Sequence, residues 1–117
     1  MEIVRHPEIE KDLKKLKKFA APVESLESWE RFFVFKGLAE TPAIDQMPGF
    51  GNKKIYKARV VLLKENISKS HGYRLIFQVL DTDKFEILVF SRHGVYHDEN
   101  DLIILIKNRI LNTNPNH

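Results

Sequence analysis

The amino-acid sequence predicts an α+β protein in which two N-terminal helices pack on one face of an antiparallel sheet, with a C-terminal helix. Three observations support this class. Apolar residues recur at helical spacing between residues 8 and 38, alternate with polar ones in three segments between 55 and 92, and return to helical spacing after 99. With 117 residues, 43% hydrophobic and 30% charged, the chain suits one domain around one core. We expect that domain at residues 1–111 and a polar tail at 112–117.

The first part of the chain is expected to be mainly helical. The letters EIV (Glu2–Val4) suit a short strand, and Pro7 suits the first turn of a helix. A helix over Glu8–Ala20 has one apolar face and lysines on its other faces, and AAP ends it. A second helix is expected from Val23 to about Leu38, with acidic residues near its N-terminus, where the helix dipole favours them. Within it, the apolar run RFFVF is also compatible with a strand.

The sheet is expected in the second part of the chain. The segment TPAIDQMPGFGNK, with two prolines and two glycines, predicts a loop. Strands are predicted at Ile55–Leu63, Gly72–Leu80 and Phe85–Arg92, and the short connections KENISKS and DTDK predict antiparallel neighbours. A last helix is predicted at Glu99–Leu111.

The same alternation predicts which side chains form the core. The buried set comprises Tyr56, Leu75, Phe77, Ile87 and Val89 on the strands, facing Leu13, Leu16 and Phe33 on the helices. Two further aromatic residues, Phe32 and Phe35, are assigned to the core as well. The alternative is that they form a groove for a partner helix.

Composition excludes several classes of protein. There are no cysteines, so disulfides, thiolate metal sites and cysteine nucleophiles are not available. No apolar run approaches the length of a membrane span, and the N-terminus is charged from its second residue, unlike a signal peptide. We expect a soluble cytoplasmic protein.

Positive charge is concentrated in the middle of the chain. Residues 51–97 contain 9 Lys and Arg against 4 Asp and Glu, whereas residues 1–50 contain 8 against 9. Strand alternation places Lys57, Arg59, Arg74 and Arg92 on one face of the sheet, away from the two N-terminal helices. Each cation alone suits a solvated surface, but four on one face indicate a surface for a polyanion such as RNA.

The segment SRHGVYHDEND follows the last strand and contains Arg92, His93, Tyr96 and His97. These side chains can donate hydrogen bonds or transfer protons. His93 and His97 have the i, i+4 spacing of metal ligands, but Gly94 separates them and no third ligand is evident. No nucleotide-binding, hydrolase or zinc-protease motif is present, so we expect no metal and no cofactor.

The segments IYKARV, GYRLIFQVLD and EILVFSRHGVY, after two N-terminal helices, resemble the RelE/ParE superfamily of toxins from toxin–antitoxin modules. The resemblance covers roughly Lys11 to Leu111 and is strongest from Ile55 to Tyr96. It implies a RelE-like fold. In the RelE branch it also implies metal-independent, ribosome-dependent cleavage of mRNA, which inhibits translation, and a cognate antitoxin that blocks the toxin. The expected partners are therefore that antitoxin, the ribosome and mRNA, and the protein is expected as a monomer or a toxin–antitoxin hetero-oligomer.

The resemblance also implies roles for individual residues. Lys57 and Arg59 stand on the strand where such toxins hold the RNA backbone, and Lys54 and His97 are assigned to RNA binding with them. Arg74 in GYR stands where an arginine stabilises the scissile phosphate. The other expected catalytic residues are Arg92, His93 and Tyr96, the tyrosine as the group that orients or deprotonates the attacking 2′-hydroxyl. The longer connection KENISKS and the apolar C-terminal helix depart from the compact members, and the identity of the general base stays open.

Two alternative functions remain. A ParE-like toxin would act by binding DNA gyrase rather than by cutting RNA. A degenerate member of the family would bind RNA or its antitoxin without catalysis.

Overall fold

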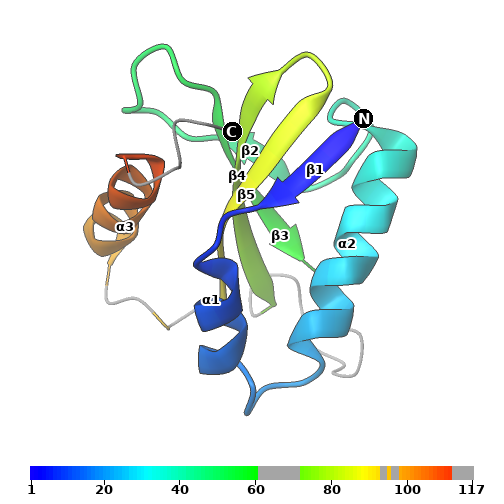
Figure 1. The fold of residues 1–117 in the computed structure, drawn as a ribbon, viewed down its shortest axis with the longest axis vertical. Helices are drawn as coiled ribbons and strands as arrows, with labels where there is room; N and C mark the ends of the chain where they lie inside the picture. Colours follow the sequence, from blue (N-terminus) through cyan, green and yellow to red (C-terminus); the bar gives the residue numbers. More distant parts are fainter. Residues whose placement is uncertain (61–71, 93–94, 96–97, 112–117) are drawn as a thin grey trace.

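The computed structural model describes residues 1–60, 72–92, 95 and 98–111, which form three helices and one five-stranded sheet (Figure 1). The elements are β1 (Glu2–Arg5), α1 (Ile9–Lys15), α2 (Pro22–Lys36), β2 (Ile44–Gln46), β3 (Ile55–Val60), β4 (Tyr73–Asp81), β5 (Lys84–Arg92) and α3 (Glu99–Leu111). The predicted α+β class is confirmed. The short strand β2 was missed, since it lies within the segment predicted as a loop.

The strands are ordered β1-β5-β4-β3-β2 across the sheet. Strands β2 to β5 pair antiparallel with their neighbours, but β1 pairs parallel with β5. The prediction of a wholly antiparallel sheet is therefore wrong at β1. Turn signals reveal the direction only of strands joined by a hairpin, and β1 is separated from β5 by most of the chain.

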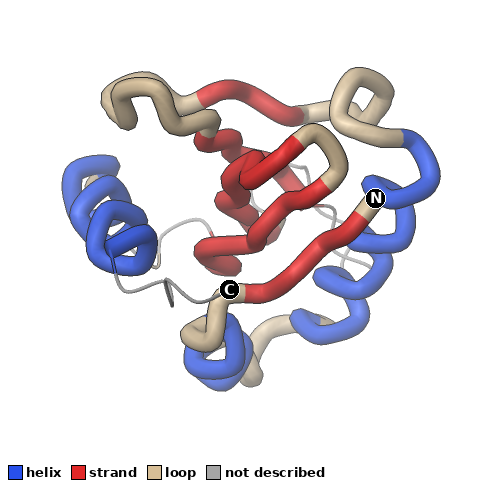
Figure 2. The backbone as a smooth tube through the Cα atoms, turned by 45° about the horizontal axis from the view of Figure 1, so that its top comes forward, coloured by secondary structure: helices blue, strands red, loops and turns tan. Residues whose placement is uncertain are grey.

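Helices cover both faces of the sheet, with α1 and α2 on one side and α3 on the other (Figure 2). The first core lies beneath α1 and α2, where Phe33 of α2 meets the rings of Phe77 and Phe85 at centroid distances of 5.3 and 5.0 Å. The second core lies beneath α3, where Leu102 and Ile106 pack on the opposite face. Its sheet residues are Ile55, Ile76, Leu88 and Val89.

Most of the predicted core is confirmed. The first core contains Leu13, Leu16, Phe33, Leu75, Phe77 and Ile87, with Tyr56 partly buried against it. Val89 is buried in the second core instead. The assignment of Phe32 and Phe35 to the core is wrong, because their exposed fractions are 43% and 80%. With Phe33 directed inward, the neighbours at i−1 and i+2 point away from the core on an α-helix.

A β-bulge in β5 determines which residues lie on which face. Ile76 pairs with Val89, but the next residue, Phe77, pairs with Ile87, so Leu88 is the extra residue. Leu88 and Val89 therefore both contribute to the second core, and Phe90 contributes to the first. The alternation of faces is inverted from the bulge to the end of β5.

A buried ion pair joins α1, α3 and β5 just beyond Ile87, the last residue of β5 that pairs with β1. The guanidinium of Arg109 donates to both carboxylate oxygens of Asp12, with N–O distances of 2.7 Å. Arg109 Nη1 also donates to the Leu88 carbonyl (2.7 Å), and Asp12 Oδ2 accepts the Phe90 N–H (2.9 Å). Two side chains thus satisfy backbone groups of β5 where β1 has ended.

His6 extends this network. Its Nδ1 accepts the N–H of Glu8 at 3.1 Å, so its Nε2 carries the proton that is donated to the Arg109 carbonyl, also at 3.1 Å. The turn between β1 and α1 is thereby bonded to the C-terminal part of α3. At the edge of the sheet, Arg5 of β1 pairs with Glu30 of α2 at 2.6 Å, and this hydrogen bond raises the pKa of Arg5.

Candidate nucleic-acid interface

The strand register places Arg59, Arg74 and Ser91 side by side across three strands. Arg59 of β3 is directly opposite Arg74 of β4, which is directly opposite Ser91 of β5. Residues that are opposite one another on neighbouring strands share a face of the sheet. This is the face of the second core, so the prediction that Arg59 and Arg74 lie away from α1 and α2 agrees with the register. We call these three residues the arginine row.

Lys57 adds a third cation beside the arginine row. It lies two residues before Arg59 on β3 and is directly opposite Ile76 of the second core. Arg59 is exposed, whereas Lys57 and Arg74 are partly buried. The arginine row lies next to Ile76 and Val89, toward the end of β5 from which the chain continues to residues 93–97.

Opposed arginines bring two like charges close together. Residues directly opposite in an antiparallel pair have Cβ atoms about 4.5–5.5 Å apart, and like charges at that spacing destabilise the sheet. The register of β3 and β4 nevertheless keeps Arg59 and Arg74 together. An anion between them would attract both guanidinium groups, and the arginine fork suits two phosphate oxygens at once.

Arg92 does not belong to this face. It is directly opposite Tyr73, which lies in the first core, and its Cζ is 4.3 Å from the ring centroid of Phe19. Tyr73 in turn donates its hydroxyl hydrogen to the Ala20 carbonyl at 2.7 Å. Arg92 and Tyr73 therefore support the connection between α1 and α2.

The prediction that all four cations share one face is thus wrong for Arg92, and the bulge at Leu88 is the reason. The run from Ile87 to Phe90 is apolar throughout, so it contains no alternation from which a change of face can be detected. Consecutive apolar residues at the centre of a strand are the only sequence sign of this bulge.

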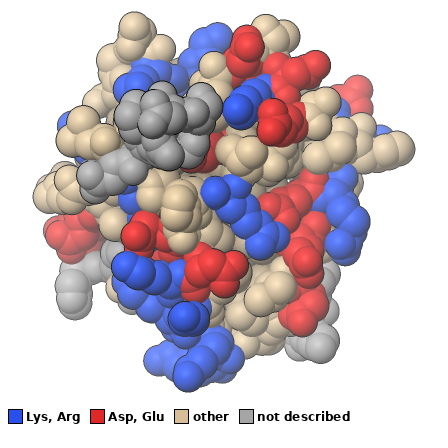
Figure 3. Space-filling model, in the orientation of Figure 1, with Lys and Arg blue, Asp and Glu red and all other residues tan. Residues whose placement is uncertain are grey.

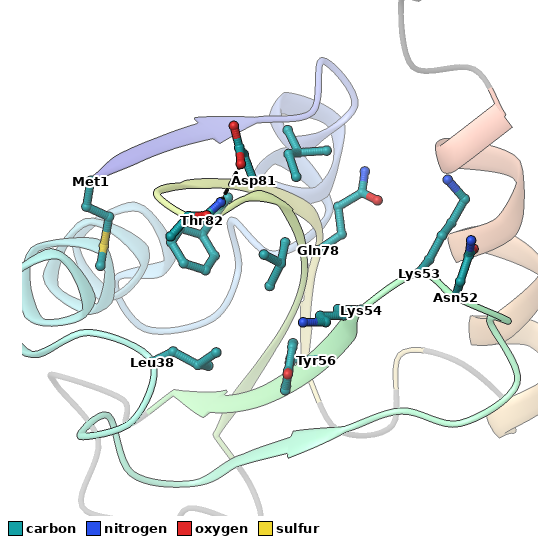
Figure 4. A pocket seen from close by; sticks show the side chains of 12 residues that line it. Met1, Leu38, Asn52, Lys53, Lys54, Tyr56, Gln78, Asp81 and Thr82 are labelled. Atoms are coloured by element: carbon teal, nitrogen blue, oxygen red, sulfur yellow. Dashed lines mark hydrogen bonds between the residues drawn. The ribbon is translucent and has the colours of Figure 1, made fainter.

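Lys54 also lies apart from the arginine row. It lines a surface pocket of about 730 Å³ together with Leu38, Tyr56 and Val79 (Figure 4). The last two pack against the first core, and Lys54 precedes β3 at the end opposite Arg59. At the rise of an extended chain, about 16 Å separates the two residues along the strand. The structure does not bring Lys54 together with Lys57 and Arg59.

Three of the predicted site residues, His93, Tyr96 and His97, lie outside the described residues. Their expected roles in proton transfer and RNA binding are not tested by the structure. The sequence places them directly after β5, within six positions of Ser91.

A second basic surface lies on α1 and the turn that follows it, where lysine and arginine side chains gather in the lower part of Figure 3. The exposed lysines there are Lys11, Lys14, Lys15, Lys17 and Lys18. Lys11 is paired with Glu8 at 3.1 Å, and their hydrogen bond lowers the pKa of Glu8. We call this set the α1 lysines. Because α1 covers the first core, this surface is on the opposite side of the sheet from the arginine row.

Within the described ranges, no three histidine, aspartate or glutamate side chains are grouped as metal ligands. Nor is any helix in that part of the chain long and apolar enough to cross a membrane.

Comparison with family models, with curated proteins and with solved structures finds no match for this chain.

Proposed function

We propose that this protein is a RelE-type toxin, a ribosome-dependent endonuclease that cleaves mRNA without a metal ion. The observation that carries the proposal is the direct opposition of Arg59 and Arg74 on two neighbouring strands, with Lys57 beside them. Three cations on a rigid sheet suit successive phosphates of a single strand of RNA, whose backbone dominates the affinity of such complexes. The proposal includes a cytoplasmic location.

Arg74 has the central catalytic role in this proposal. The 2′-oxygen of the substrate attacks the neighbouring phosphorus, the bond from phosphorus to the 5′-oxygen breaks, and the products are a 2′,3′-cyclic phosphate and a 5′-hydroxyl. Negative charge grows on the phosphorane oxygens, and a preorganised guanidinium stabilises that charge more in the transition state than in the substrate. Lys57 and Arg59 bind the flanking phosphates. His93 and Tyr96 are the candidates for taking the proton from the 2′-hydroxyl and returning one to the 5′-oxygen.

The proposed partners are the ribosome, its mRNA and a cognate antitoxin. The exposed phenylalanines of α2 support the proposal of an antitoxin partner. Phe32 and Phe35 are spaced i, i+3 and therefore lie on neighbouring parts of the helix surface. An amphipathic partner helix would cover them. As a RelE-type toxin, the protein would be a monomer when free and a hetero-oligomer with its antitoxin.

A second candidate function is RNA binding without cleavage. The observation in its favour is the position of Arg92, since an expected catalytic cation is engaged with Phe19 on the other face of the sheet. A third possibility, a ParE-like toxin that binds DNA gyrase, follows from the family resemblance alone.

The experiment that separates these functions uses purified ribosomes programmed with a defined mRNA. Primer extension should reveal cuts at the ribosomal A site when the wild-type protein is added, and no cuts when Arg74→Ala is added. Binding to the mRNA without any cut would favour the second function. Inhibition of DNA supercoiling by gyrase, with mRNA left intact, would favour the third.

A further inference from the structure

The hydroxyl of Ser91 is buried without a hydrogen bond. Only 5% of the residue is exposed, and within the part of the chain that the structure describes its Oγ has no hydrogen-bond partner. A buried hydroxyl that has lost its water and gained no partner is destabilising. Such a group calls for an explanation beyond packing, because alanine would fill the same position without this cost.

The position of Ser91 supplies the explanation. Among the described residues, Ser25 Oγ is also buried without a hydrogen-bond partner, but it lies on α2. Ser91 lies on the sheet face of the cations and directly opposite Arg74. Its oxygen can accept hydrogen bonds, and the guanidinium of Arg74 offers five N–H donors in a fixed plane.

We propose that Ser91 is a positioning residue that orients Arg74 when RNA binds. This inference rests on the proposed function. Two N–H groups of Arg74 bind phosphate oxygens, which leaves further N–H groups directed elsewhere. The Ser91 oxygen accepts one of these, and so fixes the plane of the guanidinium against the phosphate.

The same arrangement increases the distance between the two guanidinium groups of the arginine row. Arg59 is opposite Arg74 on one side, and Ser91 is opposite Arg74 on the other. When Arg74 turns toward Ser91, its charge moves away from Arg59, which then binds a neighbouring phosphate. The unsatisfied hydroxyl of the free protein is thus preorganised for the complex, at some cost in the stability of the free protein.

The test compares Ser91→Ala and Ser91→Thr in the full chain, each alone and combined with Arg74→Ala. Two quantities are measured: the rate of ribosome-dependent mRNA cleavage at saturating ribosomes and the melting temperature. We expect Ser91→Ala to lower the cleavage rate on the order of 10-fold, the size expected for a hydrogen bond to a charged group. Its melting temperature should rise by roughly 2 to 6 °C, because the unsatisfied hydroxyl has been removed. Ser91→Thr retains the hydroxyl and should restore most of the rate.

The combined variants show whether Ser91 acts through Arg74. In the Arg74→Ala background, Ser91→Ala should cause no further loss, because the partner that it positions is absent. A further 10-fold loss there, or a Ser91→Ala protein that cuts at the wild-type rate, would overturn the proposal. A melting temperature lowered by Ser91→Ala would overturn it too, since that result makes Ser91 a packing residue.

Failure of the proposed function gives a different pattern. If the wild-type protein cuts no mRNA on ribosomes, the proposed function is wrong, and the role of Ser91 that rests on it is wrong as well. If the wild type cuts and Arg74→Ala cuts equally fast, the function stands, but the catalytic role of Arg74 and the positioning role of Ser91 are wrong. If Arg74→Ala is impaired while Ser91→Ala is not, only the role of Ser91 is wrong.

Discussion

At the scale of single residues, the least expected feature is a pair of like charges on neighbouring strands. Arg59 and Arg74 are held opposite one another by backbone pairing that neither side chain can change. Substituting either one should therefore remove attraction from a complex with an anion. Function is expected to be lost while the backbone pairing of β3 and β4 is kept.

Arg74→Ala provides the first prediction. The variant should fold and should lose on the order of 100-fold or more in cleavage rate, because one preorganised electrostatic donor has been removed. Arg74→Lys should recover only part of this loss, since an ammonium group cannot bind two oxygens as the guanidinium fork does. Ribosome-dependent cleavage of a defined mRNA measures the rate, and circular dichroism checks the fold.

A matched control is available on α2, where Arg31 is exposed and distant in the sequence from the sheet residues. Arg31→Ala removes the same group and should cut at the wild-type rate. An Arg74→Ala protein that is as active as Arg31→Ala would refute the catalytic role.

The second prediction concerns the ion pair of Asp12 and Arg109, which are 2% and 6% exposed. Asp12→Ala leaves a buried guanidinium without its carboxylate and should lower the free energy of unfolding by about 3 to 5 kcal/mol. Glu10→Ala removes a carboxylate from the exposed side of the same helix and should change it by less than about 0.5 kcal/mol. Urea denaturation of both variants measures the difference. Equal effects would mean that the buried pair contributes little.

At the scale of secondary-structure elements, the bulge in β5 separates cations that strand alternation groups together. Ser91 and Arg92 are neighbours in the sequence, yet Ser91 lies on the face of Arg74 and Arg92 stacks on Phe19. One extra residue, Leu88, is enough to exchange the faces of every residue after it. The bulge therefore decides which of the predicted cations belong to the candidate interface.

The third prediction follows from this exchange. Arg92→Ala should lower stability by about 0.5 to 2 kcal/mol, because the cation–π contact with Phe19 is lost. Its affinity for a single-stranded RNA oligonucleotide should stay close to that of the wild type, whereas Arg59→Ala should bind more weakly. Urea denaturation and fluorescence anisotropy measure the two quantities. If Arg92→Ala bound RNA as weakly as Arg59→Ala, the result would show that Arg92 does contribute to RNA binding.

Periodicity predicted the elements well wherever apolar and polar residues recur regularly. The helix Glu99–Leu111 and the strand that contains Leu75 and Phe77 have the expected type and the expected bounds to within one residue. The predictions failed where this signal is lost: at the apolar run that contains Leu88, and at the three-residue strand β2 within a loop rich in proline and glycine. Periodicity cannot predict the parallel pairing of β1 with β5, because that pairing depends on the path of the whole chain.

The candidate interface could be predicted in part from the alternation of residues on the strands. Lys57, Arg59 and Arg74 lie on strands of regular alternation, so their common face followed from the sequence. Ser91 was missed because a serine within an apolar strand carries no charge signal. Its significance depends on burial and on its position opposite Arg74, and both are properties of the fold.

At the scale of the whole molecule, two basic surfaces lie on opposite sides of one sheet. The arginine row and Lys57 are on the side of α3, and the α1 lysines are on the side of the first core. The affinity for a single strand of RNA that binds the sheet should depend on the cations of the first surface. It should not depend on the α1 lysines.

The fourth prediction uses salt to tell the two surfaces apart. The logarithm of RNA affinity should fall with the logarithm of salt concentration by about 0.7 for each phosphate contact, so three cations give a slope of about 2. Arg59→Ala or Lys57→Ala should each reduce the slope by about 0.7. The double variant Lys14→Glu, Lys15→Glu on α1 is the control and should leave the slope for a short single-stranded oligonucleotide unchanged. A slope that falls only in the α1 variant would place RNA binding on the side of the sheet that α1 and α2 cover.

The ion pair of Asp12 and Arg109 also bears on how the protein is made. Its partners are 97 positions apart in the sequence, and the bond from His6 to Arg109 spans 103. A growing chain therefore exposes Asp12 long before its partner has been synthesised, and the ion pair that joins α1 to α3 cannot form until residue 109 has emerged. Contacts between such distant residues delay folding, because a long loop must be closed before they form. For a protein that acts on ribosomes, as proposed, we expect this delay to limit the activity of the unfinished chain on the ribosome that is still translating it.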